Sequence, residues 1–264
     1  MTYKPKHLSK LTQCGLLFLM LPAAAIAKPW VAPQPYHYYL GITAGASLAR
    51  NGDDNPTIHY DGNIRDSYST NSSYSTRPVI GANTGFEFIP EKGSPTFSVG
   101  LGLYTTPSPY SFYGHIDEET PGDPTALLYG SHFNVVSTRV MAEGKLNWVL
   151  GVFSPFIDAG AGISWNRAKR YQETPMSPIY PPLAPFGDKT STNFAYQLGF
   201  GISYSFNTEE DDSEDFLQDR ISLGYRYTNL GTVAFGIRGY QYPYSLNMGN
   251  FTTNDVYLTY VHFF

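Results

Sequence analysis

Eight segments in which apolar and polar side chains alternate strictly constrain the fold of this chain more than any other feature. The alternation covers residues 38–48, 78–88, 96–104, 134–147, 155–166, 192–206, 219–228 and 254–264. A period of two residues places successive side chains on opposite faces of a β-strand. In the clearest segment, Phe194, Tyr196 and Leu198 share one face, and Ala195 and Gln197 lie on the other. The sequence therefore predicts an all-β protein built from eight strands.

The connections between these predicted strands alternate between long and short. The four long connections lie at about 49–77, 105–133, 167–191 and 229–253. Loops of this length without secondary structure are rare in compact soluble domains. Transmembrane β-barrels, in contrast, combine long external loops with short periplasmic turns. We therefore predict an eight-stranded antiparallel up-and-down transmembrane β-barrel with four long extracellular loops and both chain ends on the periplasmic side.

The two faces of the predicted strands are suited to different surroundings. The apolar rows are long and rich in aromatic residues, whereas the opposite rows consist mainly of Gly, Ser and Thr with a few charges. Rows of Gly would leave voids in a hydrophobic core. They suit the narrow lumen of an eight-stranded barrel, where a few large polar side chains fill the space. The aromatic rows are thus expected to face lipid.

Residues 1–27 have the pattern of a cleaved secretory signal peptide. Three lysines precede a short apolar stretch at 15–21, and Ala25 and Ala27 form a small-x-small cleavage site. The apolar stretch is too short to span a hydrocarbon core about 30 Å thick, which argues against a membrane anchor. We expect the signal peptide to be removed and residues 28–264 to form the barrel.

Composition excludes several other classes of protein. The single Cys excludes a disulfide scaffold. The formal net charge of −5 disfavours binding to nucleic acid, because phosphate neutralisation needs clustered Lys and Arg. A polytopic helical membrane protein is excluded because no second long apolar stretch follows the signal peptide. No glycine-rich phosphate loop and no recognised metal-ligand spacing occurs, so we expect neither a cofactor nor a metal.

The last two predicted strands carry a family resemblance. The chain ends in a strand with apolar residues at alternate positions and a final Phe: Val256, Leu258, Tyr260 and Phe264. This pattern, which His262 interrupts, resembles the assembly signal of bacterial outer-membrane barrels. The segment 221–231 (ISLGYRYTNLG) resembles the seventh strand of the opacity-type surface proteins, which belong to the wider group of small OmpA- and OmpX-like barrels.

The resemblance implies a location and a set of partners. The location is the Gram-negative outer membrane, reached after cleavage of the signal peptide. The partners are the barrel assembly machinery, outer-membrane lipid and lipopolysaccharide. Members of the group are associated with adhesion, host-cell interaction or envelope maintenance, and some are called porins. A host or envelope protein ligand is therefore expected as a further partner.

Charged residues on the lumen side of the predicted strands are the first candidate site. They are Glu87, Arg139, Glu143, Lys145, Asp158 and Arg226. Charges in a confined apolar setting need partners, so we predict an ion-pair network inside the barrel. Such a network could act as a selective pore or gate, or as a plug that holds the barrel shut. Eight strands enclose little more than side chains, which favours the plug.

The chain contains only incomplete forms of the catalytic residue patterns known from barrel enzymes. Lipid A deacylases resemble barrels with a His-x-Ser pair on a lipid-facing strand, but the only such pair here, His7 and Ser9, lies in the signal peptide. An omptin-like protease would need His and acidic residues at the outer rim. The loops do contain such residues: Asp53, Asp54, His59, His115, Asp117, Glu118 and Glu119. Loop clusters of this kind are usually just solvated, so we expect no catalytic site.

The predicted external loops are rich in Tyr, which suits protein recognition because Tyr offers apolar area and a hydrogen bond at low entropic cost. The residues are Tyr60, Tyr68, Tyr74, Tyr110, Tyr113, Tyr129, Tyr171, Tyr180, Tyr240, Tyr242 and Tyr244. The alternative is that they pack the loops together. The sequence favours a non-enzymatic outer-membrane surface barrel whose loops serve adhesion or envelope interaction. A small porin or solute channel is the alternative, and a lipid-modifying enzyme is a distant third.

Overall fold

The computed structural model describes residues 36–52, 56–59, 64–70, 74–88, 95–119, 126–178, 184–206, 219–238 and 245–264. The predicted signal peptide, residues 1–27, lies outside them. Eight long strands dominate: β1 (Tyr36–Asn51), β4 (Tyr74–Phe88), β5 (Thr96–Thr105), β7 (Ala126–Asn147), β8 (Phe153–Pro175), β10 (Lys189–Phe206), β11 (Asp219–Ala234) and β13 (Asn247–Phe263). The described residues contain no helix long and apolar enough to cross a bilayer.

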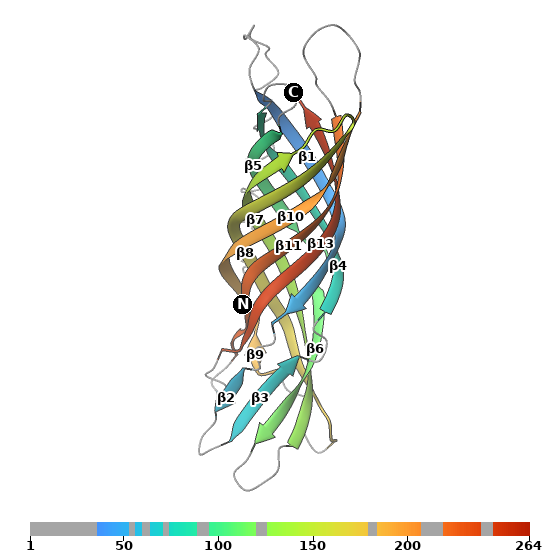
Figure 1. The fold of residues 1–264 in the computed structure, drawn as a ribbon. Helices are drawn as coiled ribbons and strands as arrows, with labels where there is room; N and C mark the ends of the chain where they lie inside the picture. Colours follow the sequence, from blue (N-terminus) through green and yellow to red (C-terminus); the bar gives the residue numbers. More distant parts are fainter. Residues whose placement is uncertain are drawn as a thin grey trace, which may run out of the picture. The chain divides into compact units, whose positions relative to one another are not determined.

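The eight long strands form a closed antiparallel ring. Each pairs with the next long strand along the chain, and β1 pairs with β13 in a register that runs from Tyr39 opposite Phe263 to Asn51 opposite Phe251. The ring (Figure 1) confirms the predicted eight-stranded up-and-down barrel. A closed ring has no strand edge, so the backbone groups of the wall are satisfied within the protein, as bilayer hydrocarbon requires.

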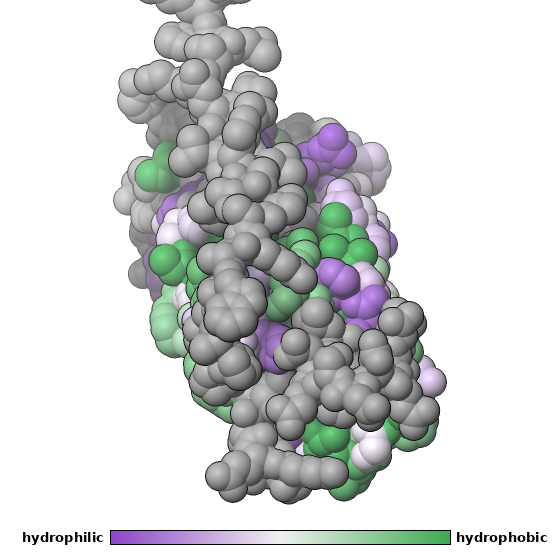
Figure 2. All heavy atoms as spheres, turned by 90° about the horizontal axis from the view of Figure 1, so that it is seen from above, coloured by the Kyte–Doolittle hydropathy of each residue, from purple (hydrophilic) through white to green (hydrophobic). Residues whose placement is uncertain are grey.

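The outer face of the ring is apolar, as the alternation predicts. Phe194 is 70% exposed, Ile42 62% and Leu258 54%, whereas their sequence neighbours Ala195 and Thr43 are buried inside. Seen from above, the described part shows hydrophobic side chains beside hydrophilic ones around the barrel (Figure 2). Large apolar side chains turned outward on all eight ring strands are stable only if they meet lipid. The barrel wall is therefore a transmembrane surface.

Aromatic side chains surround the end of the barrel that carries the C-terminus. Tyr38 contacts Phe86 and Phe264, with ring centroids 5.7 and 5.8 Å apart. A second group joins Phe153, Tyr204 and Phe206. Aromatic girdles of this kind mark the boundary between membrane and water.

Further strands extend the sheet at the opposite end. β2 (Thr57–His59), β3 (Arg65–Thr70) and β6 (Tyr110–Glu119) pair in series and join the outer half of β7. They lie at the end of the barrel away from the C-terminus (Figure 1). β9 (Phe186–Gly187) and β12 (Gly236–Ile237) form a separate two-stranded pair. Segments that the alternation leaves as loops thus contain an ordered β-extension, which we define as β2, β3, β6 and the outer parts of β7 and β8.

A bulge in β8 reverses which side chains point inward. The pairing of β7 with β8 shifts between His132 and Asn134, and Arg170 has a φ of 55°. The Arg170 N–H donates to Asp188 Oδ1 at 3.0 Å. Before the bulge the even-numbered Ala168 is buried, and beyond it the odd-numbered Tyr171 is buried. The extra residue re-aims the strand, as β-bulges do.

Candidate functional site

The lumen contains two charged residues beyond the six that the sequence suggests. All six face inward, and Arg220 and Asp255 join them. Together these eight residues comprise four carboxylates and four cations. We name these eight residues the lumen network: Glu87, Arg139, Glu143, Lys145, Asp158, Arg220, Arg226 and Asp255.

Asp255 occupies the centre of the outer part of the lumen network. Its side chain has no exposed surface. Arg139 Nη2 donates to Asp255 Oδ2 at 2.6 Å, and Arg226 Nη2 approaches the same oxygen at 3.4 Å. Ser47 Oγ donates to the other carboxylate oxygen at 2.5 Å. One fully buried carboxylate thus neutralises cations from two different strands.

Glu143 connects this centre to the middle of the barrel. Arg226 Nη1 lies 3.9 Å from Glu143 Oε1. Tyr104 donates its hydroxyl to Glu143 at 2.9 Å, and Gln197 Nε2 donates at 2.6 Å. The Arg226 guanidinium also lies 4.1 Å above the Tyr104 ring. Cation–π stacking and charge-assisted hydrogen bonds of this kind hold the Arg226 and Glu143 side chains in one geometry.

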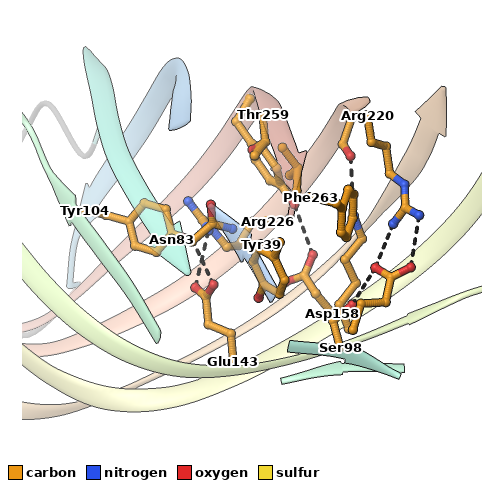
Figure 3. A pocket seen from close by; sticks show the side chains of 15 residues that line it. Tyr39, Asn83, Ser98, Tyr104, Glu143, Asp158, Arg220, Arg226, Thr259 and Phe263 are labelled. Carbon is orange, nitrogen blue, oxygen red and sulfur yellow. Dashed lines mark hydrogen bonds and ion pairs between the residues drawn. The ribbon is translucent and has the colours of Figure 1, made fainter. Parts of the chain in front are cut away.

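Glu87 and Arg220 form a separate pair nearer the end of the barrel that carries the C-terminus. Arg220 donates from both terminal nitrogens, at 2.8 and 3.0 Å, which gives a bidentate ion pair (Figure 3). Ser98 adds a third hydrogen bond to Glu87 at 3.0 Å. The Arg220 guanidinium lies 4.9 Å from the centre of the Phe263 ring. This pair links β4 to β11 across the lumen.

Lys145 and Asp158 are opposite one another on neighbouring strands without a direct ion pair. Lys145 Nζ donates to Ser203 and Ser222 at 3.3 and 3.4 Å. Asp158 accepts the Tyr257 hydroxyl at 3.0 Å. Both side chains line a cavity of about 60 Å³, whose lining side chains are drawn in Figure 3. A polar cavity of that size has room for a few water molecules.

The missed members of the lumen network were readable from the same alternation. Arg220 precedes the outward Ile221, and Asp255 precedes the outward Val256, so the parity of each strand places both inside. Both lie near the ends of the predicted strands, where the apolar row that sets the parity is shortest. Tyr104 and Tyr257 also lie on the inward rows, but the prediction of the lumen considered only the charged residues there.

An apolar cluster fills the lumen between the lumen network and the outer end. We name it the aromatic cap; its aromatic members are Tyr68, Tyr104, Tyr110, Phe112, Tyr129, Phe133, Tyr171, Phe186, Phe235 and Phe251. All eight ring strands and the three strands β2, β3 and β6 contribute to the cluster. Phe133 contacts Phe112 and Phe235 with ring centroids 5.4 and 5.3 Å apart. Tight packing of this kind leaves few voids large enough for water.

The aromatic cap changes the interpretation of the Tyr-rich loops. Tyr68, Tyr110, Tyr129 and Tyr171 are buried in it, so for these four the packing alternative is correct and recognition is wrong. Burial of the rings offsets the entropy of ordering the extension. Tyr74 and Tyr113 are exposed by more than half. The remaining residues lie outside the described part of the chain: Tyr60, Tyr180, Tyr240, Tyr242 and Tyr244.

Glu173 is a buried acid in the β-extension, beyond the lipid-facing band. Only 5% of it is exposed, and Tyr171 donates a hydrogen bond to it at 3.0 Å. Burial, together with the charge of Asp66 on β3, raises the pKa of Glu173 to about 7. Among the described residues no cation forms an ion pair with it. The folded extension therefore favours the protonated acid.

This pKa predicts that the β-extension loosens as pH rises. The folded pKa lies above the unfolded value, so the associated stability is complete below about pH 4.5 and is lost as pH rises through about 7. The change amounts to roughly 3 kcal/mol. Amide hydrogen exchange in β6 and the outer parts of β7 and β8 should be slower at pH 5 than at pH 8, after correction for intrinsic rates. Glu173→Gln keeps the hydrogen-bond acceptor and should remove this difference; a difference that persists would contradict the assignment.

The predicted assembly-signal residues lie on the lipid-facing side of β13. Val256, Leu258 and Tyr260 project outward from the strand, and Phe264 follows its end. His262 belongs to the same row, where it contacts Asp219 at 2.5 Å. The interruption of the apolar row is thus a polar contact between His262 and Asp219 at the end of the barrel that carries the C-terminus.

The loop residues considered for catalysis lie partly in the extension. His115 Nε2 lies 3.3 Å from Asp117 Oδ2, and Glu119 contacts Arg65. His59 ends β2, and Asp53 and Asp54 lie outside the described residues. Within the part of the chain that is described, no group of three or more His, Cys, Asp or Glu side chains could hold a metal ion.

No family model and no curated protein matches the sequence. Among solved structures, the chain is similar to Neisserial surface protein A (12% identity, 85% of this chain, 96% of that chain, TM-score 0.39). It is also similar to OprG from Pseudomonas aeruginosa (12%, 85%, 93%, 0.39) and to Ail of Yersinia pestis (13%, 84%, 97%, 0.32). At such scores the fold assignment depends on the chain's own geometry. Its closed eight-strand ring, lipid-facing wall and aromatic girdle make this chain an integral membrane β-barrel of the outer-membrane type.

Proposed function

We propose that this protein is a closed, non-enzymatic surface barrel that acts through contacts made by its β-extension rather than by passing solutes. One observation carries the proposal. Two successive groups of side chains, the lumen network and the aromatic cap, fill the lumen. At the same time, the sheet continues beyond the lipid-facing wall. A filled lumen gives solutes no route, and an ordered sheet beyond the membrane presents a fixed surface to molecules outside.

The outward face of the β-extension supports a role in adhesion or envelope interaction. Tyr113 is 56% exposed, and its ring lies 4.7 Å from that of His132. Next to it on β6, the His115–Asp117 pair is partly exposed. Exposed aromatic rings beside polar groups are typical of surfaces that bind proteins. The rigid sheet beneath lowers the entropic cost of binding.

Conductance tests the closed lumen. The refolded protein in a planar bilayer should show no stable open level with small ions, because the lumen network and the aromatic cap fill the interior. Heat-dependent gel mobility confirms that the same sample is folded. A reproducible open level in the unmodified protein would contradict the closed lumen and favour the small porin, with the cavity beside Lys145 and Asp158 as part of its path.

Adherence tests the contact surface. Cells that display the protein should adhere to a host-cell layer more than cells with an empty vector, and Tyr113→Ser should reduce the excess by about half or more. Tyr36→Ser is a matched control, because Tyr36 is also exposed but lies at the opposite end of the barrel. Equal adherence with and without the protein would contradict host adhesion. A lipid A or peptide turnover activity in the purified protein would contradict the non-enzymatic proposal.

A further inference from the structure

The main-chain ladder of the ring is interrupted between β4 and the strand that β5 and β6 form in succession. The pairing of β4 with β5 ends where Ile80 lies opposite Thr105, and β3 pairs with β6 only from Gly114 onward. In the described part of the chain, no main-chain pairing joins residues 74–79 of β4 to the facing residues 106–113. We name these two segments the seam.

Three prolines lie in the seam: Pro78 in β4, and Pro107 and Pro109 in the connection from β5 to β6. Proline has no N–H group and cannot donate a hydrogen bond to a neighbouring strand, so it occurs in sheets mainly at edges and bulges. The seam therefore lacks several of the donors that a continuous ladder needs.

Side chains join the two sides of the seam instead. Arg77 Nε donates to the main-chain oxygen of Pro109 at 2.5 Å, and Arg77 Nη2 donates to Ser111 Oγ at 3.2 Å. Ser75 Oγ accepts the Ser111 N–H at 3.0 Å. Hydrogen bonds from a guanidinium are charge-assisted and about twice as strong as neutral ones. Arg77 is therefore the strongest polar connection across the seam.

The seam lies directly against the aromatic cap. Val79, Tyr110 and Phe112 are buried members of the apolar cluster that forms the cap. Across the cap, the Tyr110 hydroxyl donates to Ser47 Oγ on β1 at 2.7 Å. On its other side, β6 pairs with β7 along almost its whole length, beginning at Tyr110 opposite Val135. A main-chain ladder thus fixes β6 to β7, and side chains fix it to β4 and β1.

We propose that the β-extension is a lid over the aromatic cap, hinged along β7 and held shut at the seam by Arg77. Local opening of a protein starts where few main-chain hydrogen bonds resist it. The seam is such a place, because opening it breaks the side-chain hydrogen bonds of Arg77 and Ser75 and leaves the ladder between β6 and β7 intact. An open seam uncovers Val79 and Phe112. Arg77 thus sets how often the apolar interior can be reached from outside the barrel.

Thiol labelling measures the opening. Residues 28–264 contain no Cys, so Val79→Cys introduces a single buried thiol behind the seam, and Val233→Cys places a matched buried thiol in the cap on β11. Each reporter protein is refolded in lipid vesicles, and its rate of reaction with a soluble maleimide is measured. Adding Arg77→Met should raise the labelling rate at position 79 about tenfold or more, because one hydrogen bond to a charged group contributes at least that factor. The rate at position 233 should stay within about twofold, because distant sites respond independently.

Two further variants test the role of the guanidinium. Arg77→Lys keeps a donor for the Pro109 oxygen, and it should bring the labelling rate at position 79 back to within about threefold of the protein with Arg77. Arg65→Met removes an arginine whose partner, Glu119, lies within the β-extension. It should leave the labelling rate at position 79 within about twofold, because its ion pair does not cross the seam.

Unchanged labelling at position 79 in the Arg77→Met protein would overturn the proposal. An equal rise at position 233 would do the same, because it means a general loosening of the cap, and so would an equal rise in Arg65→Met or a failure of Arg77→Lys to lower the rate. Heat-dependent gel mobility verifies that each sample is folded. If a reporter does not fold, amide hydrogen exchange in residues 106–113 of the cysteine-free protein provides the same comparison. The assay measures neither adherence nor conductance, so its failure is distinct from failure of the proposed surface function.

Discussion

Asp255→Leu should lower the free energy of unfolding by about 3–5 kcal/mol, because it leaves buried cations without their shared carboxylate. Arg139 and Arg226 are almost fully buried and both approach Asp255. In the narrow lumen neither guanidinium can turn to solvent without leaving the network. Denaturant unfolding of the refolded protein in lipid vesicles, followed by fluorescence and gel mobility, measures the change.

A double variant distinguishes the loss of the ion pair from the effect of a changed side-chain shape at position 255. Asp255→Leu combined with Arg139→Met removes one cation together with its partner. We expect it to recover a substantial part of the lost stability, since replacing both members of a buried pair by apolar groups is often nearly neutral. If Asp255→Leu alone costs less than about 1 kcal/mol, the central position of Asp255 in the lumen network is wrong.

Phe133→Ala should have an effect of similar size through the aromatic cap. Phe133 has no exposed surface and contacts three aromatic rings, those of Phe112, Tyr171 and Phe235. Removing a buried Phe typically costs about 3–5 kcal/mol, because a cavity remains where the ring lay. Denaturant unfolding reports the loss, and bilayer recordings of the same variant report whether the lumen begins to conduct.

Tyr113→Ala is the matched control for this prediction. It also removes an aromatic ring from the β-extension, but from the outward face, where more than half of the ring is exposed. The expected cost is about 1 kcal/mol or less, in the range of surface substitutions and a lost ring contact. Equal losses in the two variants would contradict a packed interior at this end of the barrel.

The sequence predicted the membrane-crossing part of the fold because two different solvents act on the two faces of each strand there. Lipid outside and charged or small residues inside produce a period of two that is visible in any single strand. The alternation with a period of two is lost toward the β-extension. On β6, Phe112 points inward and Tyr113 outward, and on β7 the buried Val135 precedes the outward Val136. When the interior becomes apolar, both faces carry similar residues and the alternation disappears.

The candidate site was likewise predictable from the sequence only in part. Alternation placed six charges on the lumen side, and their parity was enough to add Arg220 and Asp255. It could not supply the pairing, because partners such as Glu87 and Arg220 are joined across the barrel rather than along adjacent strands. The aromatic cap was missed for a further reason. Its residues come from all eight ring strands, so only the closed ring brings them together.

The lengths of β7 and β8 determine how far the protein extends beyond the membrane. β8 has 23 residues, which extend over about 75 Å at 3.3 Å per residue. At a tilt of about 40° this corresponds to roughly 55 Å along the membrane normal, and the apolar band of an outer-membrane barrel is only about 25 Å tall. The paired ends of β7 and β8 near Tyr129 and Pro175, which lie away from the turn that joins the two strands, thus stand some 30 Å clear of the hydrocarbon. These paired ends lie beyond the layer of lipid headgroups on that side of the membrane, where large molecules that approach the barrel meet them first.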